Sequence, residues 1–271
     1  MDLIYALIYG VVSGLAEMLP ISAPAHQQLL RYLFGTGQTD YLMNLFVHMG
    51  LLGAVCLAYR DALKTFFRGG KGRRGRYGPV TGAVYDFRLI KTATVFMVVV
   101  MILTMNVAQG LQHYVYLSAF FAVNGIFLYI PQHVRQSNKD ARHMTGLDGM
   151  LLGVLSGLSV FSGLSRTGIC ISSGLLRGAD QKNAVNWAFL LTVPAIVVLI
   201  LFDFGFMAMG TLGAVSFARV ALSLLSGAVA FGCGFGAIRF MNFLAVRTGF
   251  YGFAYYSWGA AFFSLILYLI T

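Results

Sequence analysis

Charged residues are scarce in this sequence, and their scarcity excludes an ordinary soluble domain. They make up 10% of the 271 residues, whereas a soluble domain of this length has roughly a quarter. With 58% apolar residues, the chain must fold with lipid as its solvent, as helices or as a closed barrel. The apolar runs also lack the polar–apolar alternation of barrel strands, so the sequence predicts an all-α integral membrane protein.

Cysteine motifs and a cleavable leader are also missing. Cys56, Cys170 and Cys233 lie in apolar stretches without CxxC or Cys/His spacing, which indicates small buried side chains rather than disulfides or metal ligands. The N-terminus has no basic n-region and no small-residue cleavage site, so we expect no removable signal peptide.

The positive charge of the chain is concentrated in one loop. The net charge is +10. Between residues 60 and 91 only Asp61 and Asp86 are acidic, and the basic residues are Arg60, Lys64, Arg68, Lys71, Arg73, Arg74, Arg76, Arg88 and Lys91. A basic loop between two apolar segments is typical of the cytoplasmic side of a membrane and its anionic lipids. We therefore predict a membrane partner and no nucleic-acid partner.

Apolar segments of two kinds organise the chain. Six are long enough to cross a bilayer: 42–59, 92–109, 114–130, 184–202, 215–238 and 250–270. Two others, 3–35 and 148–178, are apolar but interrupted by Gly, Pro, Ser and charged residues. We predict that these two are re-entrant helix-turn-helix hairpins beside about six transmembrane helices.

The two interrupted segments resemble each other. Residues 10–22 (GVVSGLAEMLPIS) align with residues 153–165 (GVLSGLSVFSGLS), and Gly35 with Gly178 keeps the register. The identical pairs are Gly10/Gly153, Val11/Val154, Ser13/Ser156, Gly14/Gly157, Leu15/Leu158 and Ser22/Ser165. A glycine-rich membrane sequence produces some such matches by chance, so the topology provides a second test.

The basic loops support an inverted repeat. With loop 60–91 in the cytoplasm, the predicted segments also place Arg135, Lys139 and Arg142 there, and both termini outside. One hairpin then enters from each face of the membrane. We predict two repeats of opposite topology, 1–135 and 148–271, with their broken helices meeting near the midplane.

The first hairpin carries a set of polar residues, namely Ser13, Glu17, Ser22, His26, Gln27 and Gln28. A carboxylate at bilayer depth costs a few kcal/mol, so Glu17 is a candidate functional residue. The alternative for Glu17 is a helix–helix hydrogen bond or a position near the interface. His26 is a candidate functional residue because it lies in the same hairpin as these polar residues.

The second hairpin contains the string SGLSRTGICISSG at 162–174. A guanidinium, several hydroxyl groups and a helix N-terminus together suit an oxyanion or a phosphate. The hydroxyls belong to Ser162, Ser165 and Thr167, and the guanidinium to Arg166. The alternative for Arg166 is an ion pair with Glu17, which does not exclude phosphate binding.

These two strings resemble the motifs of the undecaprenyl-diphosphate phosphatases, also called bacitracin-resistance proteins. They read SGLAEMLPISAPAH (13–26) and SGLSRTGIC (162–170) here, and the likeness covers almost the whole chain. The matching residues are Glu17, Pro20, Ser22, His26, Gly163, Ser165, Arg166 and Gly168. The chain departs from the family pattern at Ser13, Ala23, Pro24, Ser162, Thr167 and Cys170.

The resemblance implies roles for the matching residues. Arg166 and Ser165 would hold the diphosphate, with Thr167, Ser13 and Gly168 beside them. Glu17 would act as a base or near a metal, with Mg²⁺ or Ca²⁺ as the candidate ions. His26 would serve nucleophilic or acid–base chemistry. Because Ala23 stands where the family has its proposed nucleophile, the other routes are Ser22 or a water activated by Glu17.

The resemblance leaves three functions to distinguish. The first is hydrolysis of undecaprenyl diphosphate to the monophosphate, which recycles the lipid carrier for peptidoglycan synthesis. The second is a transporter or flippase for undecaprenyl phosphate, because inverted repeats with broken helices are typical of alternating access. The third is a lipid-phosphate binding or resistance protein with neither activity. A homodimer is a candidate assembly for each.

Overall fold

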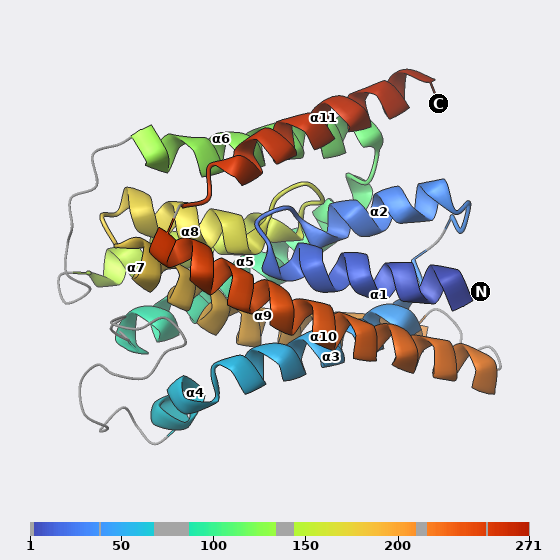
Figure 1. Ribbon diagram of the computed structural model, residues 1–271, viewed down its shortest axis with the longest axis horizontal. Coiled ribbons are helices and arrows are strands. Elements are labelled where there is room, and N and C mark those ends of the chain that lie inside the picture. The colour runs from blue at the N-terminus through green and yellow to red at the C-terminus, as the bar shows by residue number, and fades with distance from the viewer. Residues whose placement is uncertain are drawn as a thin grey trace.

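The structure, a computed structural model, describes residues 3–37, 39–67, 87–133, 144–209, 216–247 and 249–270, and within these ranges it contains helices and no strand. The helices are labelled in Figure 1. Their bounds are α1 Leu3–Met18, α2 Ala23–Leu33, α3 Tyr41–Ala58, α4 Arg60–Phe67, α5 Phe87–Gly110, α6 Tyr114–His133, α7 Gly146–Gly157, α8 Arg166–Leu176, α9 Gln181–Met209, α10 Phe217–Arg247 and α11 Gly252–Ile270. The predicted all-α class is confirmed.

Six of the helices are long and apolar enough to cross a membrane, as predicted: α3, α5, α6, α9, α10 and α11. Large apolar side chains stay exposed on their outer faces, including Leu103 (71%), Phe262 (65%) and Leu269 (72%). Such exposure suits lipid as the surrounding solvent. The short helix α4 was not predicted, because its residues fall in the basic loop 60–91. The basic positions from 68 to 76 and from 135 to 142 lie outside the described residues.

The remaining helices form two hairpins. In the first, α1 ends before Pro20, which has no N–H to continue a helix, and α2 begins at Ala23 with Pro24 in its first turn. In the second, α7 is followed by a 3₁₀ turn at Leu158–Val160 and then by α8. The turns of both hairpins meet inside the molecule, whereas their open ends lie at opposite ends of it (Figure 1).

At the open end of each hairpin, side-chain contacts join its two helices. At the first, the rings of Tyr5 and Phe34 pack edge to face, with their centroids 5.3 Å apart. At the second, Arg177 donates a hydrogen bond to Asp148 in the first turn of α7. Burial would raise the pKa of Asp148, but hydrogen bonds from Thr145 and Arg177 outweigh it and hold that pKa below its ordinary value.

Glycines let each hairpin pack closely on a long helix. A Cβ added at Gly10 would lie 2.5 Å from the carbonyl oxygen of Ser226 in α10. A Cβ at Gly153 would lie 2.3 Å from the carbonyl oxygen of Ala93 in α5. The first helix of each hairpin therefore lies against a helix from the other half of the chain, at a distance that only glycine allows. Figure 1 shows the hairpins held between these helices and the α6–α11 pair.

Candidate functional site

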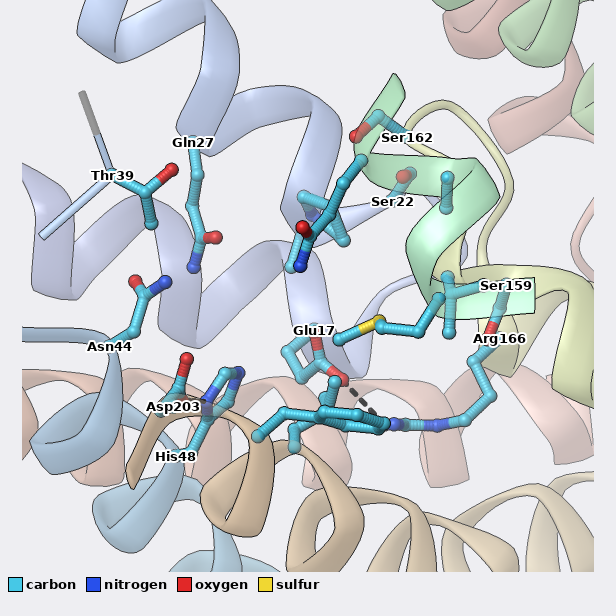
Figure 2. Close-up of a pocket in the computed structure, with 18 of the residues that line it drawn as sticks. Glu17, Ser22, Gln27, Thr39, Asn44, His48, Ser159, Ser162, Arg166 and Asp203 are labelled. Carbon is cyan, nitrogen blue, oxygen red and sulfur yellow. Dashed lines mark hydrogen bonds and ion pairs between the residues drawn. The ribbon is translucent and has the colours of Figure 1, made fainter. Parts of the chain in front are cut away.

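A polar cavity of about 1050 Å³, its open mouth included, lies where the two hairpin turns meet. Figure 2 shows 18 of the residues that line it. The walls come from both hairpins and from α3, α5 and α9. The polar lining residues are Glu17, Ser22, Gln27, Arg31, Thr39, Tyr41, Asn44, His48, Gln109, Gln112, Ser159, Ser162, Ser165, Arg166 and Asp203. Apolar side chains complete the wall, among them Met101, Met105, Leu199 and Phe202.

A buried ion pair links the two hairpins at this cavity. Nη2 of Arg166, the first residue of α8, lies 2.6 Å from Oε1 of Glu17 in the last turn of α1. The side chains are only 5% and 8% exposed. Burying two charges is costly unless they are paired, so this contact favours one arrangement of the hairpins. Nε of Arg166 is also buried and has no hydrogen-bond partner in the described part of the chain, so a donor remains for a ligand.

Two hydrogen bonds join the hairpin turns directly. The backbone N–H of Gly163 donates to the hydroxyl oxygen of Ser22 at 3.0 Å. The hydroxyl of Thr167 donates to the backbone carbonyl of Glu17 at 3.1 Å. Ser22 has φ of 70°, a left-handed conformation that a serine adopts only under constraint from its surroundings.

Asn124 on α6 holds both turns at once, and sequence reasoning missed it. Its amide nitrogen donates to the carbonyl of Pro20 at 3.1 Å and to the hydroxyl of Ser257 at 3.0 Å. Its amide oxygen accepts from the N–H of Ser165 at 2.9 Å. Asn124 is fully buried. A single amide thus fixes the first turn, the second turn and α11 relative to one another.

The start of α8 provides further donors beside Arg166. The hydroxyl of Ser165 caps this helix by accepting from the N–H of Gly168 at 3.2 Å. The first N–H groups of a helix have no partner within it, which leaves those of Arg166 and Thr167 for another acceptor. A helix N-terminus next to a guanidinium is a favourable environment for a phosphate.

His26 lies outside the cavity lining. Its Nδ1 is 2.8 Å from the carbonyl oxygen of Ser22, and its Nε2 is 2.5 Å from the hydroxyl of Tyr256 on α11. A carbonyl only accepts, so Nδ1 carries the proton and Nε2 accepts from the tyrosine. The imidazole therefore faces α11 and reaches the cavity through the backbone of Ser22.

Three other predicted site residues, Ser13, Thr167 and Gly168, do not line the cavity. Ser13 is fully buried and accepts from the amide of Gln27 at 3.0 Å, and Gln27 does face the cavity. Thr167 is turned toward the backbone of α1. Gly168 allows the close approach of Pro20, whose Cβ would lie 3.0 Å from a Cβ added there.

A second buried pair was missed from the sequence. Nδ1 of His48 on α3 lies 2.6 Å from Oδ2 of Asp203 on α9, and each side chain is 9% exposed. Both residues line the cavity. The signal that could have found them is a titratable residue inside an otherwise apolar membrane segment.

The cavity does not offer a set of ligands that fits Mg²⁺ or Ca²⁺. Its carboxylates belong to Glu17 and Asp203, and each is already paired with a basic side chain. No three His, Cys, Asp or Glu side chains gather in a group suited to a metal among the residues described. Both ions prefer several oxygen ligands. The residues of this cavity therefore do not fit either ion.

The chain is similar to one protein family and to relatives from several bacteria. The family described as bacitracin resistance protein BacA matches residues 6–263, which include most of the first hairpin and all of the second and reach into α11. Undecaprenyl-diphosphatase 1 of Shouchella clausii is 32% identical over 200 residues, which cover 73% of this chain and 72% of the relative. The undecaprenyl-diphosphatase of Treponema denticola is 29% identical over 263 residues, 94% of each chain. Undecaprenyl-diphosphatase 4 of Bacillus thuringiensis subsp. konkukian is 27% identical over 260 residues, 96% of this chain and 95% of the relative.

Proposed function

This chain belongs to the bacitracin resistance protein BacA family, and we propose from that premise that it hydrolyses undecaprenyl diphosphate to undecaprenyl phosphate and inorganic phosphate. The observation that carries the proposal is the buried Arg166–Glu17 pair at the meeting point of the two hairpins. A cation with a free donor, enclosed in an apolar protein, suits an anionic headgroup on a lipid tail.

We assign the binding of the diphosphate to the side of the cavity formed by α8. Arg166 would donate to the terminal phosphate through the guanidinium atoms that Glu17 leaves free, and the N–H groups at the start of α8 would add to this. Phosphoryl transfer places negative charge on the transferring oxygens, and fixed donors stabilise that charge without reorganising. Glu17 would hold the guanidinium in its orientation.

The predicted catalytic groups differ in what they could do from these positions. Glu17 and Ser22 line the cavity, so either could contact a bound headgroup. His26 contacts the carbonyl of Ser22 on the side away from the cavity. We propose that it holds the strained turn in place and does not contact the reacting atoms. Ala23 lines the cavity with a methyl group that has no reactive atom.

We further propose that the hairpins are re-entrant and that the halves of the chain form an inverted repeat in a bacterial inner membrane, with both termini outside. Three observations support this arrangement. The hairpins open toward opposite ends of the molecule (Figure 1). The first helix of each packs on a long helix from the other half, α1 on α10 and α7 on α5. The glycines at those contacts, Gly10 and Gly153, are equivalent in the sequence alignment.

Release of phosphate from undecaprenyl diphosphate by the purified protein in detergent tests the proposed activity. We expect steady release by the wild type and a loss of at least about a hundredfold in Arg166→Ala, because removing one donor from a transition state has costs of that order. Arg239→Ala is the matched control, since Arg239 lies exposed on α10, beside Phe235. Equal rates in the wild type and Arg166→Ala would refute the assignment of the site.

Transport of undecaprenyl phosphate between leaflets is the second candidate function. One observation favours it, namely that Ala23 and Ser13 lack the reactive groups expected at those positions while Ser165 and Arg166 keep theirs. A protein that binds the headgroup without cleaving it would show this combination. Arg166-dependent binding of undecaprenyl phosphate, together with no phosphate release from the diphosphate, would favour transport over hydrolysis.

A further inference from the structure

A buried imidazole and a buried carboxylate share one wall of the cavity. His48 lies in the middle of α3, and Asp203 lies near the end of α9, both in helices that are otherwise strongly apolar. In the view of Figure 2, Glu17 lies between this pair and Arg166. Titratable side chains in a membrane helix are costly, so a pair of them facing a cavity calls for a functional explanation.

The contact between the two side chains fixes which nitrogen of His48 is basic. Oδ2 of an ionised Asp203 can only accept, so Nδ1 of His48 carries the proton of that 2.6 Å hydrogen bond. The neutral imidazole then has its lone pair on Nε2. Within the described chain this Nε2 has no hydrogen-bond partner, and His48 is part of the cavity lining. A carboxylate that orients an imidazole in this way is a common feature of general bases.

The other candidate bases each accept a hydrogen bond already. Glu17 accepts from Arg166, and the hydroxyl oxygen of Ser22 accepts from the N–H of Gly163. His26 is turned toward Tyr256, with both ring nitrogens occupied. His48 is the imidazole that combines a place in the cavity lining with a free ring nitrogen, among the residues described.

We propose that His48, oriented by Asp203, is the general base of the hydrolysis, an inference that rests on the proposed function. Nε2 of His48 takes a proton from a water molecule, and the water oxygen forms a bond to the terminal phosphorus. The bond between that phosphorus and the bridging oxygen breaks, and its electron pair stays on the bridging oxygen, which becomes part of undecaprenyl phosphate. Inorganic phosphate leaves, and the proton on His48 returns to solvent.

Substitution of the imidazole tests the proposal. In His48→Gln we expect kcat for phosphate release to fall by about a hundredfold or more, because a general base typically contributes 10²–10⁴. The dissociation constant for undecaprenyl phosphate, which the protein binds without turnover, should change by less than about threefold, which corresponds to about 0.65 kcal/mol. Asp203→Asn should lower kcat in the same direction. His133→Gln is the matched control, because His133 lies exposed at the end of α6.

Two further measurements separate a catalytic role from a structural one. Imidazole added to His48→Ala should restore part of the lost rate, which a purely structural residue would not allow. The double variant His48→Gln with Asp203→Asn replaces the pair by two neutral amides, and retained lipid binding by it would show a folded cavity.

The outcomes distinguish the inference from the function on which it rests. If the wild type and His48→Gln release phosphate at similar rates, His48 is not the base, while the proposed hydrolysis stands. If the wild type releases no phosphate but binds undecaprenyl phosphate, both the hydrolysis and the assignment of a base are overturned. Loss of rate in His48→Gln with lipid binding intact supports the inference.

Discussion

At the scale of single residues, the cavity keeps its charges in pairs while leaving selected atoms free. Arg166 is bound to Glu17, and His48 to Asp203. Each pairing lowers the cost of a buried charge, and each leaves a nitrogen without a partner in the described chain, Nε of Arg166 and Nε2 of His48. A donor for phosphate oxygens and an acceptor for a proton are what hydrolysis of a diphosphate requires.

Ala23→Ser separates a serine nucleophile from an activated water. Ala23 lines the cavity at the first position of α2 and is 3% exposed, so a serine there would place a hydroxyl in the cavity. If water is the nucleophile, we expect the rate of phosphate release to stay within about threefold of the wild type, because the added hydroxyl takes no part in the reaction. A gain of about tenfold or more, equivalent to about 1.4 kcal/mol of activation free energy, would contradict the water mechanism.

Part of the site could be predicted from the sequence, because some of its residues lie where they interrupt an apolar segment. Glu17, Ser22, Ser165 and Arg166 interrupt apolar segments, so their cost in lipid draws attention to them. His48, Asp203 and Asn124 lie within long apolar helices that look complete without them. Their contacts join residues far apart in the chain, which no local pattern reveals, and the one local signal is that His48 and Asp203 are titratable residues inside apolar helices.

At the scale of helices, glycine spacing determines how the hairpins pack. Gly10 and Gly14 lie one turn apart on α1 and face α10, and Gly153 and Gly157 do the same on α7 against α5. These are identical pairs in the internal sequence alignment. The matching glycines therefore have the same role in both hairpins, because helix backbones can approach this closely in a membrane only across small residues.

Alanine at either contact glycine should destabilise the protein. In Gly10→Ala and Gly153→Ala the new Cβ would lie 2.5 Å and 2.3 Å from a backbone oxygen, so the helices must move apart. Overpacking of this kind costs about 1–3 kcal/mol. Thermal unfolding of the purified protein in detergent measures the effect. In the control Gly232→Ala, where nothing lies within 4 Å, we expect an unchanged or higher melting temperature. Equal melting temperatures in all three variants would contradict the packing account.

The number of helices long enough to cross a membrane was predictable, whereas some helix ends were not. The six apolar segments correspond to α3, α5, α6, α9, α10 and α11, because length and hydropathy alone decide which helices can cross a membrane. α10 continues beyond the predicted end at 238 to Arg247, because no proline interrupts it earlier. Charge at a membrane surface does not end a helix, which is also why α4 was missed.

At the scale of the whole molecule, apolar side chains lie on the outer faces and polar side chains at the centre, which is the opposite of their arrangement in a soluble protein. Leu103 and Phe262 are exposed, whereas Asn124 and Ser13 are buried. Lipid on the outside and a polar site within suit a substrate with a long apolar tail and a charged headgroup. This distribution supports a lipid diphosphate over a soluble one.

The proposed orientation predicts which parts of the chain are accessible from outside. A cysteine placed in the basic loop 60–91 should react with a membrane-impermeant thiol reagent only after the inner membrane is opened, because positive loops stay in the cytoplasm. Alkaline phosphatase fused after residue 270 should be active, since this reporter works only outside that membrane. Labelling of the loop in intact spheroplasts, or an inactive fusion, would contradict an orientation with outside termini.

Hydrolysis at the terminal phosphorus is tested by a single turnover of undecaprenyl diphosphate by the purified protein in ¹⁸O-labelled water, with both products measured by mass spectrometry. We expect one ¹⁸O atom in the inorganic phosphate, none in undecaprenyl phosphate, equal amounts of the two products, and loss of both in Arg166→Ala. Intact diphosphate at the end of the reaction, or ¹⁸O in the lipid product, would contradict hydrolysis at the terminal phosphorus in this cavity.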